Sequence, residues 1–189
     1  MPRPLRVYVP GFSFHVYQRG HNCSPIFHED CDREHFLWLV RNAARLHGVD
    51  VHAYALMTNH YHLLATPTNP RALPKAMKQV DGGYVRYYNK KHRRLGTLWC
   101  ARYRAKLIGE ERYWLACLRY IERNPVQAGM VADAAAYRWS TYGAHAGGAS
   151  ATWLATHPLY EQLGSTPDDR RRAYRAFCNR TDDEYQAPW

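Results

Sequence analysis

Hydrophobic and polar positions alternate over residues 12–19, and this period of two predicts a β-strand. Residues 30–47 instead place their apolar side chains at helical spacing, which predicts an amphipathic helix. Asp30 suits the N-cap of this helix, and Gly48 is the kind of residue at which a helix ends. The two patterns alternate along most of the chain.

The alternation of strand and helix patterns continues after residue 48. Residues 51–57 and 61–65 are expected to form two strands joined at Thr58 and Asn59, or one long bent strand. A further strand is expected at residues 99–108, and helices at residues 74–92 and 110–123. Gly82 and Gly83 predict a weak point in the first of these helices, and Pro125 predicts that the second ends at Asn124. The order β-α-β-β-α-β-α predicts an α+β fold of the ferredoxin-like kind, an antiparallel sheet with helices packed on it.

The C-terminal quarter is less regular. We expect one domain over residues 1–142 and a basic, mostly helical C-terminal extension over residues 143–189. Within the extension the composition predicts three segments: a Gly- and Ala-rich linker at 143–150, a short helix at 153–163 and a helix that begins at Thr166.

Composition narrows the class of protein. The 189 residues are 46% hydrophobic, which suffices for a core, and no apolar run approaches the roughly 20 residues of a membrane span. The N-terminus has no apolar segment typical of a signal peptide, and five widely spaced cysteines indicate reduced thiols. We therefore expect a cytoplasmic protein that does not contact a membrane. A zinc site at Cys23, His28 and Cys31 fits no standard spacing.

Charge points to a polyanionic partner. The formal net charge is +10, and residues 82–109 contain no acidic residue. Cations in this span alternate with tyrosines and a tryptophan, the combination that binds single-stranded nucleic acid. The alternative, a solvated helix face beside an aromatic core, explains Tyr84 and Tyr88 better than it explains the uninterrupted basic run.

Two candidate chemical motifs lie far apart in the sequence. His60 and His62 are two residues apart on a predicted strand, so both imidazoles can face one divalent metal ion. Taken alone, this pair is better explained as two half-exposed histidines. Tyr120 and Asn124 lie on one face of a predicted helix, where a phenol acting as a nucleophile would need activation by a base or by a metal-polarised electrophile. On spacing alone, a core tyrosine and a capping asparagine are favoured.

The two motifs together resemble a known family. Residues 57–64 and the run from Tyr120 to Gly129 are similar to the single-tyrosine HUH transposases, and more narrowly to the REP-associated tyrosine transposases. The resemblance covers roughly residues 3–142. The family usually has an aliphatic residue between its two histidines, where this chain has Tyr61, so we expect Tyr61 to face the core.

The resemblance implies a site and a mechanism. His60, His62 and Asn124 would bind Mg²⁺ or Mn²⁺, and Tyr120 would attack a phosphodiester to leave a 5′-phosphotyrosine. The substrate would be single-stranded or hairpin DNA carrying a REP-like palindrome. The residues expected to contact DNA are Arg19, Arg86, Asn89, Lys90, Arg102, Arg104 and Lys106.

Other interpretations stay open at this point. One is a non-catalytic regulator that binds DNA hairpins on the same fold, and another is a metal-dependent hydrolase of small phosphoesters. The resemblance favours a monomer over a dimer and a bacterial, nucleoid-associated location. The arginines after Thr166 either contact DNA, cover the active site or form a solvated helix face.

Overall fold

The computed structural model describes residues 7–180. The strands in this part of the chain are β1 (Phe14–Arg19), β2 (Val49–Leu56), β3 (His60–Pro67) and β4 (Arg104–Leu107). They form one antiparallel sheet in the order β2-β3-β1-β4. The larger helices are α1 (Asp30–His47), α2 (Ala72–Lys91), α3 (Glu111–Gln127) and α6 (Pro167–Cys178). The shorter ones are α4 (Tyr142–Gly147), α5 (Pro158–Glu161) and the 3-10 turns His21–Cys23 and Ala134–Ala136.

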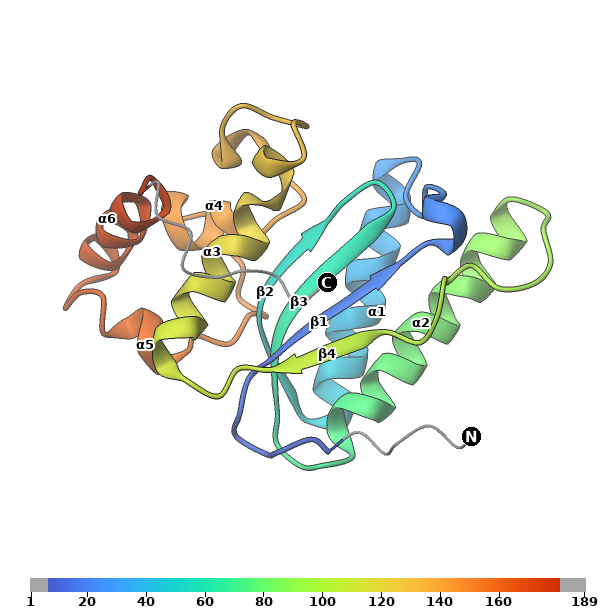
Figure 1. The fold of residues 1–189 in the computed structure, drawn as a ribbon, viewed down its shortest axis with the longest axis horizontal. Helices are drawn as coiled ribbons and strands as arrows, with labels where there is room; N and C mark the ends of the chain where they lie inside the picture. The colour runs from blue at the N-terminus through green and yellow to red at the C-terminus, as the bar shows by residue number, and fades with distance from the viewer. Residues whose placement is uncertain (1–6, 181–189) are drawn as a thin grey trace.

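The helices cover the two faces of the sheet (Figure 1). Helices α1 and α2 pack together on one face, and α3 packs on the other with α4 and α6 beyond it. The 3-10 turns aside, the first seven elements follow the order β-α-β-β-α-β-α. The predicted α+β, ferredoxin-like architecture is therefore confirmed.

Strand alternation divides the apolar residues between two cores. Phe14 and Val16 of β1 face α1 and α2, as the period of two predicts. A β-bulge between Val51 and Ala53 shifts the alternation of β2, so that Ala53 and Ala55 face α3. Tyr61 is fully buried on the α1–α2 side, where its hydroxyl donates to Asp81 at 2.7 Å. The expectation that Tyr61 faces the core is confirmed.

Helix α1 has the predicted length, with one change at its start. Glu29 rather than Asp30 is the N-cap, and it forms a capping box with Asp32. Gly48 ends the helix in the left-handed conformation, with φ of +73°. Helix α2 runs unbroken through Gly82 and Gly83. The weak point expected there stays a prediction. A Cβ on Gly83 would lie 2.9 Å from Leu39 Cδ2, so the glycine permits close packing of α2 on α1.

The strand predicted at residues 99–108 is wrong over its first half. Only Arg104–Leu107 pairs as β4, and Trp99 forms a single bridge with Gly20. Between them the Gln18 side chain donates to the Ala101 carbonyl at 2.7 Å, in place of a ladder hydrogen bond. This detour leaves residues 100–102 on the wall of a cavity.

Three C-terminal predictions need correction. Helix α3 does not end at Asn124 but continues past Pro125 to Gln127. The missing N–H of Pro125 removes one bond, to the Ile121 carbonyl, so close to the helix end that the last turn still forms. Residues 143–150 are not a linker, since α4 buries side chains there, and only Pro158–Glu161 of the 153–163 segment is helical. The Thr166 N-cap of α6 is confirmed.

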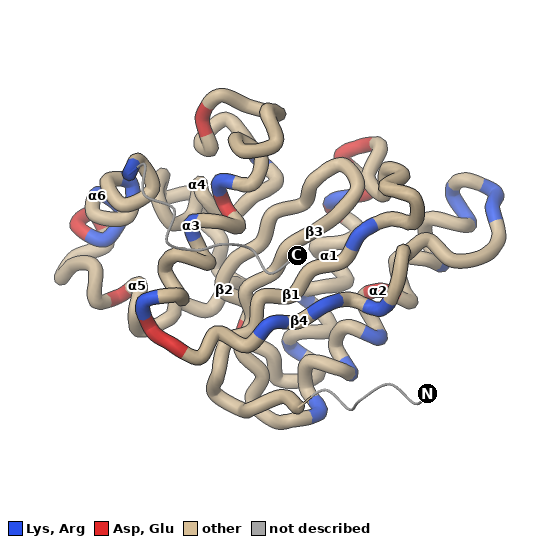
Figure 2. The backbone as a smooth tube through the Cα atoms, viewed as in Figure 1, with Lys and Arg blue, Asp and Glu red and all other residues tan. Residues whose placement is uncertain are grey.

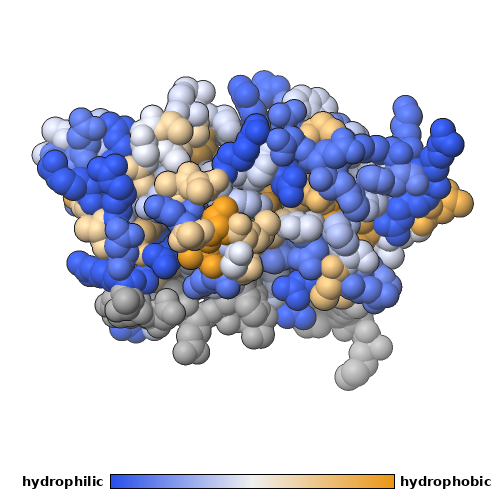
Figure 3. Space-filling view, turned by 90° about the horizontal axis from the view of Figure 1, so that it is seen from above, coloured by the Kyte–Doolittle hydropathy of each residue, from blue (hydrophilic) through white to orange (hydrophobic). Residues whose placement is uncertain are grey.

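The surface is strongly basic in places. Lys and Arg recur along β4, α2 and the loop after α2, and again on α6 (Figure 2). The face seen in Figure 3 is mostly hydrophilic around small hydrophobic spots. Within residues 7–180, no helix is long and apolar enough to cross a membrane. All five cysteines are free thiols.

Candidate active site

Strands β1 and β3 bring two polar rows together on the α3 side of the sheet. Their antiparallel register places Arg19 opposite His60, and Tyr17 opposite His62. Because directly opposed residues share a face, all four side chains point towards α3. Both histidines therefore leave the same side of β3, as the spacing of two predicted.

Helix α3 closes this face with two residues one turn apart. Asn124 Oδ1 lies 3.4 Å from His60 Nε2. The Tyr120 ring lies 5.8 Å from the His62 ring, measured between ring centroids. The structure thus brings together the four residues Tyr120, His60, His62 and Asn124, although Tyr120 lies 58 positions after His62 in the sequence.

A relay of hydrogen bonds fixes the tautomer of His60. The Asn59 amide nitrogen donates to the Cys23 carbonyl at 2.9 Å, which leaves Asn59 Oδ1 as an acceptor. That oxygen lies 2.7 Å from His60 Nδ1, so Nδ1 carries the proton. The lone pair of His60 is then on Nε2, the nitrogen that faces Asn124 Oδ1. Two electron-pair donors facing one another at 3.4 Å are suited to a cation between them.

A third histidine, His15, contacts His62. His15 is fully buried on β1, and its Nε2 lies 3.0 Å from His62 Nδ1. With His62 Nδ1 donating, Nε2 of His62 is the nitrogen that carries the lone pair. Neither His15 nor Asn59 was among the residues predicted from the sequence. The alternation of strand 12–19 placed His15 on the correct face, but only the register of β1 on β3 shows its contact.

Burial keeps the imidazoles neutral at physiological pH. It lowers the pKa of His60 to about 4, with Arg19 contributing and a hydrogen bond to Asn124 opposing. It lowers the pKa of His15 to about 3, assisted by Lys106, and the pKa of His62 falls well below its usual value. Neutral imidazoles are the form that binds metals or accepts protons.

Burial acts in the opposite sense on Tyr120, raising the pKa of its phenol to about 12. A hydrogen bond from Asn124 and the charge of Arg19 partly offset this rise. The phenol is therefore protonated at neutral pH and would need to lose its proton during an attack on phosphorus.

The donor set fits a divalent cation. Two imidazole nitrogens and one amide oxygen suit Mg²⁺ or Mn²⁺ when substrate oxygens complete the shell, and imidazole also admits softer metals. Within the described part of the chain, no group of three or more His, Cys, Asp or Glu side chains is arranged to hold a metal. Asn124 is accordingly the residue that would supply the third protein ligand.

These residues line an open cavity of about 520 Å³. Three arginines share it with them: Arg19, Arg102 and Arg104. Arg104 donates to the Tyr17 hydroxyl at 3.1 Å, and its guanidinium lies over the Tyr17 ring. Cations beside an aromatic ring are suited to a nucleotide chain, whose phosphates and bases they can contact together.

The other predicted DNA contacts lie outside this cavity. Lys106 is on β4 opposite His15, close enough to lower the pKa of that histidine. Arg86 and Lys90 are exposed on α2, which covers the far face of the sheet. Asn89 donates its side-chain amide to the Gly96 carbonyl at 2.8 Å and so holds the loop after α2. Their contacts with DNA stay predictions.

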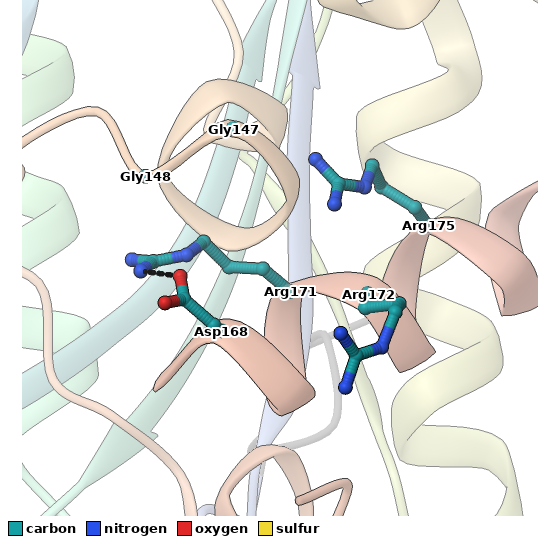
Figure 4. A pocket seen from close by; sticks show the side chains of 6 residues that line it. All are labelled: Gly147, Gly148, Asp168, Arg171, Arg172 and Arg175. Carbon is teal, nitrogen blue, oxygen red and sulfur yellow. Dashed lines mark hydrogen bonds and ion pairs between the residues drawn. The ribbon is translucent and has the colours of Figure 1, made fainter. Parts of the chain in front are cut away.

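A second hollow lies between α4 and α6 (Figure 4). Arg171, Arg172 and Arg175 line it together with Asp168 and the glycines at the end of α4. Arg171 pairs with Asp168 at 2.5 Å, and Arg175 donates to the Ala146 carbonyl at 3.1 Å. The first contact lies within α6 and the second joins α6 to α4. No described residue of α6 lines the cavity that contains Tyr120.

The chain is similar to solved structures of other proteins. A solved structure of a REP-associated tyrosine transposase bound to a REP hairpin superposes with a TM-score of 0.62 at 15% identity, over 84% of this chain and 93% of that one. A putative transposase from Deinococcus radiodurans R1 gives a TM-score of 0.45 at 18% identity, over 60% of this chain and 91% of that one. At these identities the first likeness establishes the fold alone.

No curated protein matches the chain significantly. The family model for IS200-like transposases matches residues 8–124, a span that begins before β1 and ends at Asn124. It therefore includes both histidines of β3, Tyr120 and the basic span between them. The resemblance found in the sequence is confirmed at this level: the chain belongs to the IS200-like transposase family.

Proposed function

We propose that this protein is a metal-dependent endonuclease and strand transferase for single-stranded DNA that carries a hairpin. The observation that carries this proposal is the convergence of Tyr120, Asn124 and the two β3 histidines on one arginine-lined cavity. A protein that only binds hairpins has no chemical need for this arrangement. A hydrolase of small phosphoesters would not need the arginines along the wall.

The side chains suggest a division of roles. His60, His62 and Asn124 would hold Mg²⁺ or Mn²⁺, which when bound supplies Lewis-acid polarisation of the scissile phosphate. Arg19, Arg102 and Arg104 would hold the backbone on either side of that phosphate by charge-assisted hydrogen bonds. The His15 and His62 rings pack beside the phenol, each 5.8 Å from its ring between centroids, and the proton of the phenol would pass to water in the open cavity.

The reaction would then be a transesterification. Tyr120 Oη attacks phosphorus and loses its proton, while the bond from phosphorus to the 3′ oxygen breaks and that oxygen takes up a proton. The products are a 5′-phosphotyrosine and a free 3′-hydroxyl. Attack by a different 3′-hydroxyl reverses the step and joins two strands. The phosphodiester energy is kept in the covalent bond, so no nucleotide cofactor is required.

The cavity is complete within one chain, which favours a monomer as the active unit. Its histidines, its tyrosine and its arginines all come from the same copy. Light scattering during size-exclusion chromatography, with and without hairpin DNA, tests this. A monomer that forms the covalent adduct supports it, and activity confined to a dimer contradicts it.

The test of function is a covalent adduct. Purified protein is incubated with Mg²⁺ or Mn²⁺ and with single-stranded oligonucleotides that contain a palindrome and its flanks, and products are separated under denaturing conditions. We expect a protein–DNA adduct that is absent with EDTA and absent in Tyr120→Phe. The matched control is Tyr113→Phe, on the same helix but outside the cavity.

Two outcomes would contradict the proposal. An adduct that persists in Tyr120→Phe removes Tyr120 from its role. Tight hairpin binding without an adduct on any palindrome supports the non-catalytic regulator instead.

A further inference from the structure

The loop between α2 and β4 ends in an isolated apolar side chain. This loop projects beyond the body of the molecule at the end of α2 (Figure 1). Leu95 at its tip is 94% exposed, the largest fraction among the large hydrophobic residues of the described chain. The corresponding end of the molecule in Figure 3 shows hydrophobic surface bordered by hydrophilic surface. A leucine in such a position gains nothing from the fold itself.

The loop is held in shape by its own hydrogen bonds. Asn89 donates to the Gly96 carbonyl at 2.8 Å, and the Arg94 amide donates to the Asn89 carbonyl at 3.0 Å. The Arg94 guanidinium donates to the Thr97 carbonyl at 3.1 Å and lies over the Tyr88 ring. Two residues take positive φ to close the turn, Arg93 at +47° and Gly96 at +90°. Leu95 is therefore presented on a defined support.

The tip is connected to the candidate active site by a short path. Cys100 and Arg102 line the cavity, and Leu95 precedes Cys100 by five residues. This segment is fastened to the end of β1, since the Cys100 amide donates to the Arg19 carbonyl at 3.0 Å. Five residues span at most about 18 Å, which corresponds to about five nucleotides of stacked DNA. A strand held in the cavity would place its next few nucleotides at the tip.

The surroundings of Leu95 favour DNA over other partners. Arg93 and Arg94 precede it directly, Lys90 lies one turn before them, and residues 82–109 contain no acidic side chain (Figure 2). Phosphates on both sides of an inserted side chain would meet these cations. An apolar residue flanked by cations is the arrangement with which proteins insert a wedge between base steps.

We propose that Leu95 is a wedge that stacks on the base pair at the foot of a DNA hairpin, where the stem meets the single strand that enters the cavity. This inference rests on the DNA binding in the proposed function but not on its covalent chemistry. It predicts that the protein recognises a junction at a fixed distance from the scissile phosphate, with about five nucleotides or fewer between the tip of the loop and the cavity wall at Cys100.

The test reports base stacking directly. A hairpin carrying 2-aminopurine at the foot of its stem is titrated with Tyr120→Phe protein, which cannot form the proposed covalent bond. We expect fluorescence to rise as the wedge disturbs stacking, and a probe in the middle of the stem to stay unchanged. Leu95→Ala should lose the rise and bind the hairpin roughly tenfold more weakly. It should bind unstructured single strands as before, and Leu95→Met should retain both properties.

Leu46→Ala is the matched control, since Leu46 is also exposed but lies on α1, which covers the face of the sheet opposite the cavity. Both leucines are on the surface, so neither variant should alter the unfolding midpoint. If Leu95→Ala keeps the fluorescence rise and the hairpin affinity, the wedge is overturned while the proposed function stands. If no variant and no wild-type protein binds any hairpin, both fail together.

Discussion

The carboxylate of Glu122 on α3 accepts a hydrogen bond from the hydroxyl of Tyr174 on α6 at 2.7 Å. Its other oxygen lies 2.6 Å from Nδ1 of His145 on α4, and Glu122 is fully buried. On the same helix, Arg119 and Arg123 donate to carbonyls at the end of α6 and just beyond it. The helix that carries Tyr120 is therefore attached to the C-terminal segment by residues on both sides of that tyrosine.

Replacing Glu122 by alanine should destabilise the protein by roughly 3 kcal/mol, because it leaves two buried donors without an acceptor. It should also reduce adduct formation, because α3 loses its attachment to α4 and α6. Urea unfolding measures the first effect and gel analysis the second. Glu34→Ala, an exposed change on α1, is the control. Unchanged stability in Glu122→Ala would show that the C-terminal helices do not hold α3.

Asn59 should determine metal affinity without touching the metal. In Asn59→Ala, Nδ1 of His60 loses its acceptor and the tautomer is no longer fixed, so Mn²⁺ affinity should fall by about 10–100-fold. Calorimetric titration of Mn²⁺ into the protein without DNA measures this independently of activity. Asn59→Asp keeps the acceptor and should bind Mn²⁺ more tightly than the alanine variant. Equal affinity in all three proteins would contradict the role.

A buried series of hydrogen bonds makes the protonation of His52, which lies outside the candidate active site, unfavourable. Trp114 Nε1 donates to Ser13 Oγ at 2.9 Å, Ser13 and Thr66 are joined at 2.7 Å, and Thr66 lies 2.8 Å from His52 Nε2. His52 Nδ1 donates to the Ala155 carbonyl at 2.8 Å. Every hydrogen bond in this series can form when His52 is neutral, because the Ser13 hydroxyl donates to Thr66 and the Thr66 hydroxyl donates to His52 Nε2. A second proton on His52 would oppose the whole chain.

Stability should therefore fall as the pH is lowered below 6.5. Burial lowers the pKa of His52 to about 4 in the folded protein, so between these values the unfolded chain binds more protons than the folded one. The contribution of neutral His52 to the free energy of unfolding is complete above pH 6.5 and is lost towards pH 4, at roughly 1.4 kcal/mol per pH unit. Urea midpoints across this range should change less with pH in His52→Asn than in the wild type. His21→Asn, at an exposed position, should retain the wild-type slope.

The arginines in the cavity and the arginine on α2 should affect different steps, DNA cleavage and DNA binding. Arg104→Ala, in the cavity, should weaken DNA binding, reduce adduct formation and lower the salt dependence of binding by roughly one phosphate contact. Arg86→Ala, on α2, should weaken binding without slowing cleavage of DNA already bound. Fluorescence anisotropy over a salt series and single-turnover cleavage separate the two effects. Equal loss of cleavage in both variants would contradict the distinction.

Local patterns placed the members of each pair on one face, and the family resemblance assigned them to a site. His60 and His62 share a face because of the period of a strand, and Tyr120 and Asn124 because of the period of a helix. Asn59 and His15 could not be found this way, because their roles depend on the Cys23 carbonyl and on the pairing of β1 with β3. Such contacts join residues far apart in the sequence and leave no periodic signal.

The errors in the predicted fold have similar causes. The strand predicted from residue 99 is interrupted because Gln18 takes the place of a strand neighbour, which no alternation reveals. Helix α4 forms in a Gly- and Ala-rich stretch because Tyr142, His145 and Ala146 are buried against the rest of the molecule. In both places tertiary packing overrides the local preference of the backbone.

The continuation of α3 through Pro125 has a consequence for how this protein can vary. Because Asn124 lies inside the helix, its direction is set by the number of residues that separate it from Tyr120. One inserted or deleted residue between them would rotate Asn124 by about 100° around the helix axis and carry its amide away from His60. Substitutions in this interval are tolerable wherever packing allows, but a change in its length is not.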